Sequence, residues 1–196
     1  MIEALLAAPA RLGRVRLLAV DGPSGAGKST LASEVVAGLR ARGCRTELVS
    51  TDAFATWDDP VGWWPRLVDG VLKPLAAGVD GAYRQLGWST GVPQPGELVR
   101  VMLPDVLVLE GVSSGRASAR PLLSHLCWIS GGTEAERLAR SVARDGVASR
   151  AELGRWQRFE RGWFAVDGTP DAAGTRLSSG LDHSRSVSEA LRIDQG

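Results

Sequence analysis

The chain has 196 residues, the size of one domain, and its hydrophobic fraction of 44% and charged fraction of 23% are typical of globular proteins. The formal net charge is +1 and there is no basic run, which argues against a nucleic-acid-binding protein. The apolar runs are too short to cross a membrane and residues 1–6 lack a signal-peptide pattern, so we expect a cytoplasmic protein without a membrane partner. The sequence leaves open whether the protein forms a homo-oligomer.

The hydrophobic pattern alternates between strands and helices. Short apolar runs predict strands, and apolar residues at every third or fourth position predict helices. In chain order we expect a strand at 14–20, a helix at 29–42, a strand at 46–50, a mainly helical segment at 64–77, strands at 105–109 and 125–130, helices at 133–144 and 152–165, and a weak strand at 176–178. Segment 78–97 is rich in glycine and proline and has no clear period, so we expect a long loop there that is functional or mobile.

Residues 22–29, Gly-Pro-Ser-Gly-Ala-Gly-Lys-Ser, match the phosphate-loop pattern G-x-x-x-x-G-K-[ST] between a strand and a helix. Glycines let successive amides turn inward around an anion, and the helix N-terminus adds positive charge. The Lys28 ammonium can reach the β- and γ-phosphates, and the Ser29 hydroxyl can ligate Mg²⁺. The motif therefore predicts ATP and Mg²⁺ as cofactors. The residues expected to bind the nucleotide are Gly22, Ser24, Gly25, Ala26, Gly27, Lys28, Ser29 and Thr30.

Together these patterns predict an α/β protein with a three-layer P-loop NTPase fold. We expect a parallel sheet of about five strands, helices on both faces and a small lid. The domain should span residues 1–181, with the lid at about 144–155, and 182–196 should be a polar C-terminal tail.

Two carboxylates follow predicted strands, at the sheet edge where ligands bind in open α/β folds. Asp52 follows the second strand and can accept a proton from an attacking hydroxyl. Glu110 follows the strand at 105–109 and can bind Mg²⁺ together with Ser29. The alternatives are that Asp52 is a helix cap or turn former and that Glu110 ends its strand in an ordinary turn.

Arginines gather on and after the predicted helix at 133–144. Arg137, Arg140 and Arg144 share one helical face, and Arg150 follows. Such side chains can close over a triphosphate and neutralise the charge that develops during transfer. We expect Arg140 and Arg144, with Lys28 and Asp52, to be catalytic, and Arg140 also to bind the nucleotide. The alternative is a solvated basic face.

Aromatic residues lie between the second and third of the long strands. Tyr83 and Trp88 can stack a flat ring, with Arg84 beside them, although helical tryptophans are more often core residues. The expected substrate-binding set is Asp52, Tyr83, Arg84, Trp88, Glu110 and Arg150.

The chain resembles the uridine kinase family of P-loop nucleoside kinases, and the broader set with phosphoribulokinase and pantothenate kinase. The resemblance covers roughly residues 14–180 and rests on the segments GPSGAGKST (22–30), STDAF (50–54), PDVLVLEG (104–111) and ERLARSVARD (136–145). It implies that Asp52 is the general base, that Glu110 lies near Mg²⁺, and that Arg140, Arg144 and Arg150 are the lid arginines.

The stretch 83–88 departs from this pattern. It keeps the tyrosine, but it has no counterpart of the histidine found in members that phosphorylate uridine. The resemblance therefore implies an ATP- and Mg²⁺-dependent kinase that phosphorylates a hydroxyl of a small molecule, with a nucleoside as the first expectation. The alternatives are a kinase of a non-nucleoside alcohol (a sugar, a cofactor precursor or an antibiotic) and a non-catalytic nucleotide-dependent switch.

Overall fold

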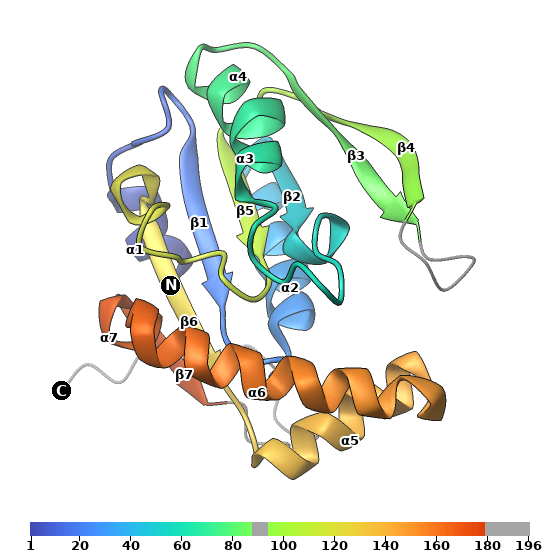
Figure 1. Ribbon diagram of the computed structural model, residues 1–196. Helices are drawn as coiled ribbons and strands as arrows, with labels where there is room; N and C mark the ends of the chain where they lie inside the picture. The colour runs from blue at the N-terminus through green and yellow to red at the C-terminus, as the bar shows by residue number, and fades with distance from the viewer. Residues whose placement is uncertain (88–93, 179–196) are drawn as a thin grey trace, which may run out of the picture.

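A five-stranded parallel sheet lies at the centre of the structure, a computed structural model that describes residues 1–87 and 94–178 (Figure 1). The strand order is β2-β5-β1-β6-β7, and every pairing is parallel. The strands are β1 (Arg16–Asp21), β2 (Thr46–Ser50), β5 (Val106–Glu110), β6 (His125–Ser130) and β7 (Thr175–Ser178). The predicted sheet is confirmed.

Helices cover both faces of the sheet, because its central strands present apolar side chains in both directions. Leu18 and Val20 of β1 face α1 (Ile2–Ala7) and α2 (Lys28–Arg40) on one side. Leu17 and Ala19 face the other side, where α3 (Trp64–Leu67) packs. All five residues of β5 are buried, as expected for a strand covered on both faces. These three layers confirm the predicted fold class.

The segment predicted as one helix at 64–77 is divided. A π-helical turn, Val68–Leu72, separates α3 from α4 (Lys73–Ala76). Pro74 explains the division, because proline has no amide to donate and its ring clashes with the carbonyl four residues earlier. α1 was not expected from the sequence.

The expected loop at 78–97 is wrong: most of it forms an antiparallel hairpin of β3 (Gly81–Gly87) and β4 (Gln94–Val101). Most of its side chains are exposed or half-buried, so a two-residue hydrophobic alternation is lacking. The register also shifts between Arg84 and Leu86. Trp88 lies outside the described residues.

The C-terminal part crosses the end of the sheet. Helix α5 (Glu134–Asp145) begins with a capping box between Thr133 and Glu136. A short 3₁₀ turn, Val147–Ser149, leads into α6 (Arg150–Asp167), which Figure 1 shows running across the carboxyl ends of the strands. The short helix α7 (Thr169–Ala172) precedes β7. The predicted tail at 182–196 lies outside the described residues.

No helix in residues 1–87 or 94–178 is both long enough and apolar enough to span a membrane.

Candidate phosphate-binding site

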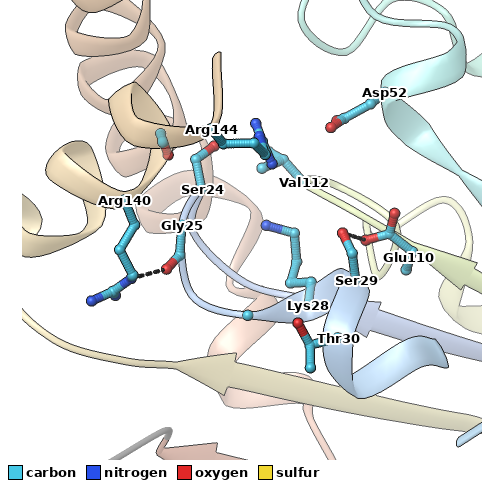
Figure 2. A pocket seen from close by; sticks show the side chains of 12 residues that line it. Ser24, Gly25, Lys28, Ser29, Thr30, Asp52, Glu110, Val112, Arg140 and Arg144 are labelled. Atoms are coloured by element: carbon cyan, nitrogen blue, oxygen red, sulfur yellow. Dashed lines mark hydrogen bonds between the residues drawn. The ribbon is translucent and has the colours of Figure 1, made fainter. Parts of the chain in front are cut away.

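A cavity of about 330 Å³ lies at the carboxyl ends of the strands (Figure 2). It joins the phosphate loop, the ends of β2 and β5, and helix α5. Its lining residues are Ser24, Gly25, Gly27, Lys28, Ser29, Thr30, Asp52, Glu110, Val112, Arg140, Ser141 and Arg144. The structure therefore brings together most of the predicted site from four separate segments.

The phosphate loop needs glycine at two places where φ is positive and a carbonyl oxygen of another segment lies close. Gly25 has φ +75°, and a Cβ there would lie 2.5 Å from the Arg137 carbonyl oxygen. Gly22 has φ +151°, and a Cβ there would collide with the Ile129 carbonyl oxygen. The loop can therefore pack closely against β6 and α5 only without side chains at these positions.

Lys28 begins α2 directly after the loop and is 9% exposed. Its Nζ donates to the carbonyl oxygen of Pro23 at 3.0 Å, within the same loop. Figure 2 shows Lys28 and Ser29 on the loop side of the cavity, with Arg144 and Asp52 facing them. The ammonium thus lies at the phosphate loop without an acidic partner within ion-pair distance among the described residues.

Glu110 ends β5 beside the phosphate loop. The Ser29 hydroxyl donates to its Oε2 at 3.2 Å, so the two predicted metal ligands are already adjacent. Burial raises the pKa of Glu110, and the Asp52 charge adds to this, while hydrogen bonds from Ser50 and Ser29 and the Lys28 charge oppose it.

This pair of oxygen donors suits Mg²⁺, a hard cation that typically takes one or two protein ligands and completes its shell with phosphate oxygens and water. In the described ranges there is no group of three or more His, Cys, Asp or Glu residues that could hold a metal unaided. Ser29 and Glu110 would hold the ion, which would screen the charge of the bound phosphates.

The raised pKa of Glu110 leads to a pH-dependence prediction. Glu110 takes up a proton at a higher pH than an exposed glutamate does, and a protonated carboxyl is a poor Mg²⁺ ligand. We expect the affinity for Mg²⁺ and a non-hydrolysable ATP analogue to fall as the pH is lowered, beginning above the usual glutamate range. Calorimetric titrations between pH 8 and pH 5 measure this. Glu110→Gln should bind more weakly and retain only the nucleotide's own pH dependence; equal profiles for the two proteins would contradict the prediction.

Asp52 lies in a 3₁₀ turn, Thr51–Ala53, directly after β2. Its amide donates to the Ser50 hydroxyl at 3.3 Å, and its own side chain is exposed toward the cavity. The carboxylate is therefore accessible to a ligand, as a general base must be.

The predicted arginines take different places. Arg140 Nε donates to the Gly25 carbonyl oxygen at 2.8 Å, so this side chain braces the phosphate loop. Arg144 lines the cavity while its guanidinium pairs with Asp145 at 2.6 Å. Arg150 is exposed at the start of α6 and does not line the cavity.

The lid stays a prediction, which hydrogen exchange can test. Residues 146–153 contain the short 3₁₀ turn, where Val147 is 78% exposed, so few apolar contacts hold the segment before the buried Leu153. We expect its amide exchange to slow when Mg²⁺ and a non-hydrolysable ATP analogue bind, because phosphates supply partners to the arginines. Exchange over α1 should stay the same. Unchanged exchange over 146–153 would count against a closing lid.

The predicted aromatic surface is only partly available to a ligand. Tyr83 of β3 packs on Phe54 with ring centroids 4.7 Å apart, and Phe54 stacks on the buried Trp63. Burial raises the pKa of the Tyr83 hydroxyl, and the Glu47 charge adds to this. Arg84 is exposed and donates weakly to the Gly96 carbonyl oxygen at 3.4 Å. Phe54 and Trp63 are therefore core residues that support Tyr83.

Two carboxylates at the phosphate loop were not predicted. Asp21 at the end of β1 is fully buried and accepts hydrogen bonds from the amides of Gly22, Ser113 and Gly115 at 2.7, 3.1 and 2.8 Å. It ties the loop to the segment after β5. The position of Asp21 directly before the phosphate-loop motif could have identified it from the sequence. Glu160 of α6 also contacts the loop, and no local pattern marks it.

No protein-family model and no curated protein matches this chain. Solved structures do match it. The first is described as a possible uridine kinase from Bacillus stearothermophilus, with 17% sequence identity and a TM-score of 0.61 over 83% of this chain and 88% of that one. The second is provisionally assigned as a fructose transport system kinase from Silicibacter sp. TM1040, with 19% identity and a TM-score of 0.57 over 91% and 97% of the two chains.

A third similar structure is the YGR205w protein, with 12% identity and a TM-score of 0.51 over 84% of this chain and 85% of that one. At these identities the likeness establishes a common fold, and function must be argued from the site. The predicted resemblance to P-loop kinases of the uridine kinase type is therefore confirmed for the fold.

Proposed function

We propose that the protein is an ATP- and Mg²⁺-dependent kinase that transfers the γ-phosphoryl group to a hydroxyl of a small molecule. One observation carries the proposal: the phosphate-loop lysine, a Ser–Glu pair suited to Mg²⁺, an exposed aspartate and two arginines share one cavity. These are the parts that phosphoryl transfer requires, namely a phosphate cradle, charge neutralisation and a proton acceptor.

In the proposed reaction, Asp52 accepts the proton of the acceptor hydroxyl as its oxygen attacks the γ-phosphorus. The new oxygen–phosphorus bond forms as the bond to the β-phosphate oxygen breaks, so that ADP leaves in line. Lys28 exchanges the Pro23 carbonyl for phosphate oxygens, and Arg144 contributes a positive charge from α5. Arg140 keeps the phosphate loop in place through Gly25.

A nucleoside is the first candidate acceptor, because Tyr83 presents a half-buried aromatic ring on the Phe54 side chain, close in sequence to Asp52. A non-nucleoside alcohol such as a sugar is the second. It is favoured by the similarity to the provisional fructose transport system kinase and by the absence of a histidine from stretch 83–88. The free thiols Cys44 and Cys127 and the need for ATP agree with a cytoplasmic location.

A substrate panel tests the proposal. Purified protein is incubated with Mg²⁺, ATP and separate nucleosides, sugars, cofactor precursors and aminoglycoside-type alcohols, and products are identified by the mass of one added phosphoryl group. We expect one class to be phosphorylated, and the Lys28→Ala protein to yield far less of that product. ATP hydrolysis that only a protein partner stimulates, with no phosphorylated acceptor, would favour the nucleotide-dependent switch instead.

A further inference from the structure

Glu160, a buried carboxylate near the middle of α6, is bonded to the phosphate loop itself. The Ser24 amide donates to both Glu160 carboxylate oxygens at 3.0 Å, and the Ser24 hydroxyl donates to Oε2 at 2.7 Å. Glu160 is only 2% exposed. An anionic side chain therefore already occupies two hydrogen-bond donors of a loop whose motif is built to bind anions.

The charge of Glu160 is not neutralised by a direct partner. Among the described residues no lysine or arginine forms an ion pair with it, although Lys28 and Arg137 act on it at longer range. Burial accordingly raises the pKa of its carboxyl, opposed by the Ser24 hydroxyl. A negative charge beside the phosphate loop weakens the attraction of phosphates to the loop. Nucleotide binding alone therefore does not account for the presence of Glu160.

Helix α6 also contacts the segment that follows Asp52 and helix α5, the other two parts of the site. Trp156, one turn before Glu160, meets Trp57 edge-on with centroids 6.0 Å apart, and Trp57 lies in the segment after Asp52. Gln157 donates to the Glu134 carbonyl oxygen at the start of α5, the helix that carries the cavity arginines. Helix α6 thus contacts the phosphate loop, the segment that follows Asp52, and helix α5.

Ser24 lies at a place where binding of the terminal phosphate in the wrong position would affect phosphoryl transfer. Figure 2 shows it at the Arg144 end of the loop, with Thr30 at the opposite end of the cavity. If its amide and hydroxyl were available, they would offer the terminal phosphate extra hydrogen bonds at that end. Bonds that hold the terminal phosphate at that end, away from Asp52, would stabilise the bound nucleotide more than the transition state.

We propose that Glu160 is a positioning residue for phosphoryl transfer: it holds Ser24 away from the nucleotide, so that the γ-phosphate rests on the later amides of the loop and on Lys28, facing Asp52. This inference rests on the proposed function. Glu160 acts through Ser24 and itself touches neither nucleotide nor acceptor.

Glu160→Gln tests the role, because it keeps the size of the side chain and removes its charge. We expect it to bind Mg²⁺ and a non-hydrolysable ATP analogue about threefold more tightly or better, because a nearby negative charge is lost and the one remaining neutral oxygen holds the Ser24 donors more weakly. We expect its kcat for phosphoryl transfer to fall about tenfold or more, because the terminal phosphate is then misplaced. The matched control is Asp171→Asn, an exposed carboxylate of α7 that pairs with Arg176 away from the cavity and the predicted lid; it should change neither quantity.

Opposite changes in affinity and kcat would support the proposal, since a merely structural residue would lose affinity, kcat and thermal stability together. That joint loss, or an unchanged Glu160→Gln protein, would overturn it. If Glu160→Gln does not fold, Glu160→Asp shortens the side chain and loosens its hold on Ser24 while keeping the charge, and should lower kcat without weakening nucleotide binding; unchanged kcat, or a joint loss of affinity and kcat, would overturn the proposal. Wild-type protein that does not bind the analogue would contradict the proposed function itself.

Discussion

Replacing Lys28 by alanine is expected to lower kcat/KM at least about a hundredfold, which corresponds to roughly 3 kcal/mol of transition-state stabilisation. The reason is geometric. The Lys28 ammonium lies at the phosphate loop, bonded to the Pro23 carbonyl oxygen rather than to an acidic side chain. Its loss removes positive charge from the transferring phosphoryl group while leaving the apolar core of α2 intact.

The measurement is steady-state kinetics with the acceptor that the substrate panel identifies. Lys73→Ala is the matched control, because Lys73 is the chain's other lysine and pairs at the surface with Asp69. It should keep full activity. Near-normal turnover in a folded Lys28→Ala protein would rule out this loop as the reaction centre.

Asp52→Asn is expected to lower acceptor phosphorylation by about 10²–10⁴-fold, the usual contribution of a general base. Asparagine keeps the shape and one oxygen but cannot take up a proton. Nucleotide affinity should change little because it depends on the phosphate loop. Thermal stability should also hold, since the Asp52 side chain is exposed.

The control is Asp58→Asn, an exposed carboxylate of the segment that follows Asp52. It should retain activity. Full phosphorylation by Asp52→Asn, or a large loss with Asp58→Asn instead, would refute the assignment of Asp52. A drop in melting temperature together with nucleotide affinity would mark Asp52 as a structural residue.

Local signals explain which parts of the fold were predictable. β2 and β6 were predicted with the bounds that the structure shows, because each is a short apolar run. The hairpin was missed because it depends on pairing between Tyr83 and Val99 and their neighbours, with little burial to impose a pattern. Pairing between two strands leaves no hydrophobic alternation in the sequence when most side chains on both faces are exposed or half-buried.

The same distinction holds for the site. The phosphate loop could be recognised because its residues are contiguous and their chemistry requires that spacing. Asp52 and Glu110 could be placed because parallel strands end at one edge, and the structure puts both in one cavity. Glu160 could not be placed, because it meets Ser24 from 136 positions away and its helix shows an arginine-rich surface pattern.

The hairpin has a consequence for how such a protein can diverge. β3 and β4 pair only with each other among the described strands, and β3 reaches the domain through the π-helical turn and the contact of Tyr83 with Phe54. We therefore expect substitutions at the exposed positions of the hairpin, in contrast to the buried Val101, to leave the register of β1 and β5 undisturbed. If Tyr83 binds the acceptor of the proposed kinase, part of the choice of acceptor is encoded in a stretch of sequence separate from the phosphate loop. We would then expect substitutions in the hairpin to change the acceptor while the residues that bind ATP stay the same.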